Sequence, residues 1–238
     1  MRTGPFVHPT AIIEDEVVIG GGSSVWDHAH LRRGALIGED CIVGGKSYLA
    51  NGVRVGDRCK INGMVFLCAG VSLGDGVFVA AHTTFTNDFY PRACTNDLTA
   101  LRPSDIDEHT TFTTVQDGVS IGAAATIGSD LVLGRFAVIG MGAVVTRSVP
   151  AYTLVLGAPA RPVALVCRCG RPLVTLLDGA PPDGEYRCGP CGVGYGVRGG
   201  AVVHDPLGAG PPIPVQRGPG HPTPLEVAET GGTAQLAG

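Results

Sequence analysis

Apolar residues recur at every sixth position along the first 85 residues of the chain, from Val7 to Phe85 without a break. A second series of small or β-branched residues follows four positions after each of them, from Ala11 to Thr83. A period of six fits neither a helix, which repeats every 3.6 residues, nor an ordinary strand, which repeats every two. The pattern therefore predicts a solenoid, in which each short unit buries its apolar side against the next unit.

The same register returns later in the chain. Its apolar positions are Val115, Ile121, Ile127, Leu133, Ile139 and Val145. A six-residue repeat indicates a parallel β-helix of short strands with a turn after each strand. We expect three flat faces, and therefore an all-β triangular prism in which three repeats complete one coil. Residues 18 apart then stack in columns, and one outward column holds Thr10, His28, Lys46, Met64 and His82.

Residues 86–114 interrupt the repeat with a polar segment that holds two prolines and has no periodicity. Loops of this length inside a compact domain are usually functional. We expect a β-helix domain over residues 1–162, with this excursion forming an active-site loop. A separate cysteine-containing segment follows over 163–203, and a Pro/Gly-rich tail over 204–238 that we expect to be flexible.

Four cysteines of the third segment have the spacing of a metal site: Cys167, Cys169, Cys188 and Cys191. The set reads C-x-C and C-x-x-C, with glycine after Cys169 and Cys191. Four thiolates in such turns are typical of a structural zinc ribbon. The alternative is four reduced cysteines without a metal.

Composition narrows the function classes. Glycine is abundant at 37 residues and aromatic residues make up only 5%, which fits a narrow interior lined by aliphatic side chains. The net charge of -4 and the lack of a long basic run argue against binding to nucleic acid or to an anionic membrane surface. No apolar stretch of about 18 residues and no signal peptide is evident, so we expect a cytoplasmic protein.

The flat faces and the open sheet end of a prism need cover, which predicts a homotrimer with sites between subunits.

Longer strings resemble a known family. The chain contains VHPTAII (7–13), SSVWDHAHLRRGALIG (23–38), HTTFTNDFYPRA (82–93), VSIGAAATIG (119–128) and VLGAPARP (155–162). Together they resemble the left-handed β-helix acyltransferases, and within them the nucleotide-linked 3-amino-sugar N-acetyltransferases. The resemblance covers about residues 5–200. It implies a left-handed β-helix that transfers an acetyl group from acetyl-CoA to the 3-amino group of a dTDP- or UDP-linked sugar.

The resemblance also suggests catalytic roles. It implies that Asn87 orients the sugar amine while the departing sulfur takes the proton. Otherwise Asn87 is a turn residue. His82 is the candidate base, and its other interpretation is a solvated corner histidine. Asp88 could orient Asn87 or bind a sugar hydroxyl, or it could simply cap the first turn of the loop.

Binding residues are expected beside these. Arg92 offers a planar fork of donors for a diphosphate or a sugar carboxylate, Tyr90 could stack on the sugar or the base, and His30 belongs to the second-coil string; each could instead be structural. Backbone groups of the later coils would hold the pantetheine of acetyl-CoA, and Arg147 and Arg161 would meet its phosphates, unless both are ordinary surface charges. The expected backbone contacts are Ala123, Gly140, Gly142 and Ala143, which plain β-helix packing also explains.

Two other functions remain open. The same fold could acylate a sugar hydroxyl or transfer a longer acyl chain, and a hydroxyl acceptor would make a catalytic histidine essential. A non-catalytic β-helix scaffold would bind no acetyl-CoA and would give the tail a function. A carbonic-anhydrase-like site needs three converging histidines, and His28, His30 and His82 form no H-x-x-x-x-H pair.

Overall fold

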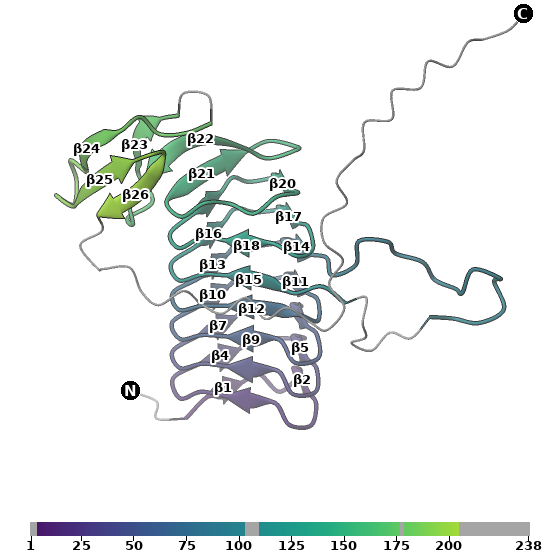
Figure 1. Cartoon of the computed structure of the whole chain (residues 1–238). Coiled ribbons are helices and arrows are strands. Elements are labelled where there is room, and N and C mark those ends of the chain that lie inside the picture. The colour runs from purple at the N-terminus through teal and green to yellow at the C-terminus, as the bar shows by residue number, and fades with distance from the viewer. Residues whose placement is uncertain (1–3, 103–109, 177–178, 205–238) are drawn as a thin grey trace, which may run out of the picture.

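The computed structural model describes residues 4–102, 110–176 and 179–204. Over these residues the regular structure consists of β-strands, and the long repeat forms a parallel β-helix with three faces (Figure 1). The predicted all-β fold class is confirmed. Residues 103–109 of the excursion and 205–238 of the expected tail lie outside the described residues.

Each face of the prism is one sheet, built by every third strand. Sheet A contains β1 (Phe6–Val7), β4 (Ser24–Val25), β7 (Ile42–Val43), β10 (Lys60–Ile61), β13 (Phe78–Val79), β16 (Ser120–Ile121), β19 (Val138–Ile139), β21 (Thr153–Leu156), β22 (Arg161–Val166) and β23 (Pro172–Thr175). Sheet B contains β2 (Ile12–Ile13), β5 (His30–Leu31), β8 (Tyr48–Leu49), β11 (Phe66–Leu67), β14 (Thr84–Phe85), β17 (Thr126–Ile127) and β20 (Val144–Val145). Sheet C contains β3 (Val18–Ile19), β6 (Leu36–Ile37), β9 (Arg54–Val55), β12 (Val71–Leu73), β15 (Thr113–Val115) and β18 (Val132–Leu133).

The pairing register is the 18-residue coil that the sequence predicts. Ile61 of β10 pairs with Val43 and with Val79, one coil on either side. The second residue of each two-residue strand points into the prism, and in the inner coils it is almost completely buried. Because one coil covers the next, the core is a continuous column of aliphatic side chains.

The first coil departs from this expectation. Val7 and Ile13 belong to the six-residue series, yet each is 37% exposed. Within the described residues no coil lies beneath them, so their inward side chains meet solvent at this end of the prism. The burial expected from the repeat is therefore wrong at these two positions and holds where a coil is stacked on both sides.

The cysteine-containing segment continues from the last coil. β21 pairs in parallel with β19, while β22 and β23 add antiparallel strands to sheet A. The expected domain boundary at residue 162 thus falls inside β22. A three-stranded antiparallel sheet follows, made of β24 (Gly184–Arg187), β25 (Gly194–Arg198) and β26 (Ala201–His204).

An aromatic stack joins this segment to the prism. Phe136 stacks on Tyr152 with ring centroids 5.4 Å apart, and Tyr152 meets the edge of Tyr195 at the same distance. Tyr152 and Tyr195 are 2% and 1% exposed. The contact is therefore a small second core between the two parts. Within the described ranges, the structure contains no helix with the length and apolar character needed to cross a membrane.

Candidate functional site

A column of outward corner residues runs between sheets A and B. His28, Lys46, Met64 and His82 all have positive φ, with 62° at His82. Each coil is tied to the one below through this corner, as the His82 amide donates to the carbonyl of Gly63 at 3.3 Å. The column predicted from the 18-residue spacing is therefore present. The His82 side chain is exposed and has no hydrogen-bond partner among the described residues.

Asn87 lies at the base of the excursion, just after β14. Its side-chain Nδ2 donates to the carbonyl oxygen of Ala69 at 3.1 Å, and its own carbonyl accepts from the Thr111 amide at 3.0 Å. Asn87 is half-buried. The first bond orients the side-chain amide and leaves Oδ1 as its remaining acceptor, while the second fixes the Asn87 backbone.

Within one chain, the structure does not bring the two principal candidates together. His82 precedes β14 at the corner between sheets A and B, whereas Asn87 follows β14 at the corner between sheets B and C. The width of sheet B separates them. A site that uses both residues needs a second copy of the chain.

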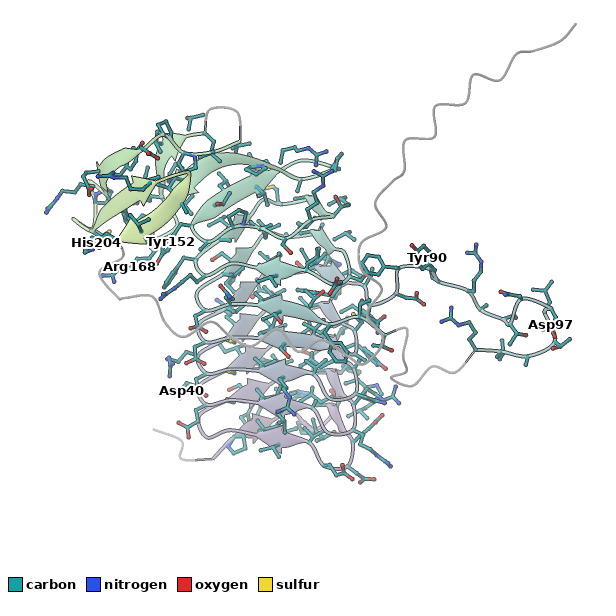
Figure 2. All side chains as sticks on the ribbon, viewed as in Figure 1. Asp40, Tyr90, Asp97, Tyr152, Arg168 and His204 are labelled. Carbon is teal, nitrogen blue, oxygen red and sulfur yellow. The ribbon has the colours of Figure 1, made fainter. Side chains whose placement is uncertain are left out.

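The excursion leaves the prism as an arm (Figures 1 and 2). Asp88 Oδ1 accepts from the Tyr90 amide at 2.8 Å, which is the turn-capping contact considered above. Tyr90 is 68% exposed, and the exposed Arg92 donates through Nη1 to the carbonyl of Pro91 at 2.9 Å. Both side chains are thus available to a ligand, while Asp88 is partly committed to the loop.

Arg102, on the returning side of the arm, also contacts this stretch. Its Nη1 donates to the carbonyl of Tyr90 at 3.2 Å and lies 3.9 Å from Asp88 Oδ2. Sequence reasoning missed Arg102, because nothing in the aperiodic segment indicates which residues face each other.

His30 lies on β5, three strands away from β14 in sheet B, so it is not placed beside Asn87. Its Nε2 is 2.8 Å from Glu14 Oε1, and its ring meets the edge of Tyr48 at 5.3 Å. Glu14 also pairs with Arg32, and hydrogen bonding from that guanidinium lowers the pKa of the Glu14 carboxyl to about 2. The His30 ring is therefore bound into the contacts around Glu14 on the first coils.

Most of the expected acetyl-CoA contacts lie at or near the upper part of the corner column. Ala123 and Gly142 are exposed there, and the Gly142 amide donates to the Ala123 carbonyl at 2.8 Å. Gly140 is half-buried beside them. Ala143 needs a correction, because it is 0% exposed and its amide and carbonyl already bond within the prism. It cannot contact a cofactor.

The two arginines expected to meet phosphates are both exposed near the top of the prism. Arg147 follows β20. The hairpin between β21 and β22 folds over β20, since the Val144 amide donates to the Gly157 carbonyl at 3.0 Å. Arg161 leaves this hairpin tip and donates to the carbonyl of Ala160. The hairpin therefore brings Arg161 to the same end of sheet B as Arg147.

The four predicted metal ligands converge. The sulfur atoms of Cys167, Cys169, Cys188 and Cys191 all lie within 4.8 Å of one another. Sγ of Cys167 is 3.4 Å from that of Cys191, and Sγ of Cys169 is 3.7 Å from that of Cys188. Tetrahedral zinc with bonds of about 2.3 Å places its sulfur ligands roughly 3.8 Å apart. The donor set therefore fits a zinc ion bound by four thiolates, with Cys167 and Cys188 buried and the other two exposed.

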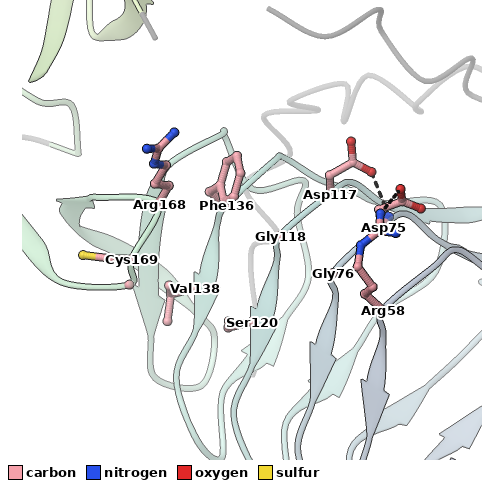
Figure 3. A pocket seen from close by; sticks show the side chains of 11 residues that line it. Arg58, Asp75, Gly76, Asp117, Gly118, Ser120, Phe136, Val138, Arg168 and Cys169 are labelled. Carbon is pink, nitrogen blue, oxygen red and sulfur yellow. Dashed lines mark hydrogen bonds and ion pairs between the residues drawn. The ribbon is translucent and has the colours of Figure 1, made fainter. Parts of the chain in front are cut away.

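A separate groove of about 490 Å³ lies between the cysteine-containing segment and the corner where sheets C and A meet (Figure 3). Arg168 and Cys169 line one side, while Phe136, Asp117 and Arg58 line the prism side. Arg58 is already paired with Asp75 at 2.8 Å. The groove contains none of the predicted catalytic residues, so it is distinct from the Asn87 region.

Known proteins share the six-residue repeat of this chain. A family model described as "Hexapeptide repeat of succinyl-transferase" matches residues 34–69. The dTDP-3-amino-3,6-dideoxy-alpha-D-galactopyranose 3-N-acetyltransferase of Aneurinibacillus thermoaerophilus is 38% identical over 90 residues, which is 38% of this chain and 43% of that protein. An acyl-[acyl-carrier-protein]–UDP-N-acetylglucosamine O-acyltransferase of Brucella ovis is 50% identical over 36 residues, which is 15% of this chain and 13% of that protein. The matches thus span less than half the length of these curated relatives.

A solved structure shares the fold. It is a variant of AntD, an N-acyltransferase from Bacillus cereus, in complex with dTDP and coenzyme A. The TM-score is 0.54 at 19% identity, over 65% of this chain and 86% of that chain. The chain thus contains the hexapeptide repeat and has the β-helix fold, and over part of its length it is similar to a nucleotide-linked amino-sugar N-acetyltransferase.

Proposed function

We propose that this chain is an acetyl-CoA-dependent N-acetyltransferase that acts on the 3-amino group of a dTDP- or UDP-linked amino sugar. The observation that carries the proposal is the fixed side-chain amide of Asn87 at the base of the arm, with Oδ1 as its remaining acceptor. The identity to a dTDP-sugar 3-N-acetyltransferase and the fold shared with a protein bound to dTDP and coenzyme A support it.

The chemistry needs little from the protein beyond placement. A neutral amine attacks the thioester carbonyl, the C–N bond forms, the C–S bond breaks, and a proton from the amine goes to the departing sulfur. Asn87 Oδ1 would accept an N–H of the amine and turn its lone pair toward the carbonyl carbon. Holding two reactants in such a geometry can lower the barrier by about 7–11 kcal/mol.

The proposed assembly is a homotrimer in which each site lies between two copies. His82 precedes β14 and Asn87 follows it, so the two residues lie at opposite ends of one strand of sheet B. Neighbouring prisms would present the His82 corner of one copy to the arm of the next. Sheet B also carries the exposed apolar residues Ile12 and Phe66, 54% and 41% exposed, which a second prism would cover. In this arrangement Tyr90 and Arg92 would bind the nucleotide sugar. Ala123, Gly140, Gly142, Arg147 and Arg161 would bind acetyl-CoA.

The proposed metal is one zinc ion per chain, bound by the four cysteines. All four ligand positions are protein thiolates, so no position remains open for a substrate. The zinc would therefore be structural. It would fix Cys167 beside Tyr195, whose hydroxyl lies 3.1 Å from the Cys167 sulfur, and so hold the aromatic stack against the last coil.

A mass-spectrometric turnover assay tests the function. The protein is incubated with acetyl-CoA and with dTDP- and UDP-linked 3-amino sugars, each beside its 3-hydroxy counterpart. We expect a product heavier than the substrate by about 42 Da, the mass that one acetyl group adds (C2H2O), with the amino sugars only. Acetylation of the hydroxy sugars would indicate an O-acyltransferase instead, and absence of acetyl-CoA binding would indicate a scaffold.

A further inference from the structure

We propose that Arg102 is a positioning residue that fixes the outgoing side of the arm and thereby holds Asn87 and Asp88 in place. The inference rests on the proposed function for its effect on turnover, but the contact itself is a property of the chain alone. Arg102 is only 23% exposed in its side chain, although the arm around it is largely open to solvent.

The two sides of the arm are joined by backbone hydrogen bonds at two separate levels. At the base, the Thr111 amide donates to the carbonyl of Asn87 at 3.0 Å. Further out, the Arg102 amide donates to the carbonyl of Ala93 at 3.0 Å. Between these levels lies Pro91, which has no amide to donate.

The Arg102 guanidinium contacts the outgoing side between these two levels. It reaches back from the outer level to the Tyr90 carbonyl and approaches the Asp88 carboxylate. Asp88 in turn accepts from the Tyr90 amide, so one guanidinium binds one end of the Asp88–Tyr90 turn and lies near the other. A planar guanidinium with several donors suits a simultaneous contact to a carbonyl and a carboxylate, which a lysine reproduces only in part.

The neighbouring arginine shows the contrast. Arg92 is exposed, and among the described residues its side chain bonds only to the carbonyl of the adjacent Pro91. Arg92 is therefore free to meet a ligand, whereas Arg102 is engaged by the arm. The Arg102 guanidinium also places a positive charge beside Asp88, which reduces the repulsion that this carboxylate would exert on a diphosphate.

The test compares Arg102→Ala and Arg102→Lys with Arg54→Ala, a matched change at an exposed arginine on sheet C. Hydrogen–deuterium exchange is measured over residues 86–94 in the protein without ligands. We expect exchange there to rise at least threefold in Arg102→Ala, with the prism strands and the Tm unchanged, and to be partly restored in Arg102→Lys. If exchange in Arg102→Ala equals that of the unmodified protein, Arg102 does not fix this segment.

Turnover then tests the positioning role. We expect kcat for the amino sugar to fall about 10- to 100-fold in Arg102→Ala, as for other small displacements of a reacting geometry, with the KM for acetyl-CoA within twofold. Faster exchange with an unchanged kcat would overturn the positioning role while leaving the N-acetyltransferase proposal intact. If the unmodified protein acetylates no amino sugar, the proposed function and the positioning role both fail. The exchange comparison still decides whether Arg102 fixes residues 86–94.

Discussion

The side-chain amide of Asn87 donates to the carbonyl oxygen of Ala69, one coil below it, at 3.1 Å. This bond distinguishes the two ends of the amide, because the nitrogen is used by the prism and the oxygen remains for a ligand. An acceptor in a fixed position suits a substrate amine, which has N–H groups to donate.

The first prediction concerns this oxygen. Asn87→Ala removes the acceptor, and we expect kcat for the amino sugar to fall about 100-fold, in line with the loss of one orienting group. Asn87→Asp keeps the shape of the side chain but brings a carboxylate against the Ala69 carbonyl. We therefore expect this variant to have a reduced kcat as well. Steady-state kinetics gives the result, with Asn96→Ala at the exposed arm as control. Full activity of Asn87→Ala would remove Asn87 from the mechanism.

The second prediction tests the shared site by mixing subunits. If His82 of one copy and Asn87 of another serve the same site, His82→Asn and Asn87→Ala subunits complement each other when refolded together. In an equal mixture, roughly one site in four then contains both native residues. If His82 is the base, each preparation is poorly active alone, and we expect the mixture to show about a quarter of the native activity.

Two controls make this experiment decisive. Refolded native protein gives the reference activity, and size-exclusion chromatography with light scattering gives the assembly state. No recovery in a mixed trimer would contradict a site shared between copies, and a monomer would contradict the trimer itself. If His82→Asn alone keeps full kcat near neutral pH, then His82 is not the base.

Much of the prism could be predicted because the same physical requirement recurs in every coil. Ile61 pairs with Val43 and Val79 because all three occupy the same inward position 18 residues apart. The pattern even places Ala143 in the inward series, so its burial was predictable. The family resemblance favoured a cofactor contact there, and the local packing rule was the better guide.

The arm could not be predicted in the same way. Its residues share no period, so nothing in the order of amino acids shows that Arg102 reaches back to Asp88 and Tyr90. The Glu14–Arg32 pair is different, because these residues are 18 apart and the coil spacing places them in adjacent coils. The cysteine cluster was predictable, because ligand spacing and glycine turns are themselves local signals.

The third prediction concerns that cluster. We expect one zinc per chain by elemental analysis of untreated protein. Alkylation of the native protein at pH 8 should then label Cys94 alone, because Cys41, Cys59 and Cys68 are buried and burial raises the pKa of Cys68 to about 12. After treatment with a strong chelator, the four cluster cysteines should become reactive as well. Labelling of all four in untreated, metal-analysed protein would contradict the zinc site.

The fourth prediction follows from Glu14. Hydrogen bonding from Arg32 lowers its pKa in the folded protein from 4.5 to about 2. A carboxyl with a depressed folded pKa stabilises the fold fully above its ordinary pKa, and this contribution is lost as the pH falls toward the folded pKa. We therefore expect the native protein to lose stability between pH 4.5 and pH 2 more steeply than Glu14→Gln. Urea unfolding at several pH values in this window measures the difference.

Asp15→Asn, at the exposed neighbouring position, serves as the matched control and should follow the native curve. Parallel curves for the native protein and Glu14→Gln would show that the Glu14 network does not stabilise the first coils.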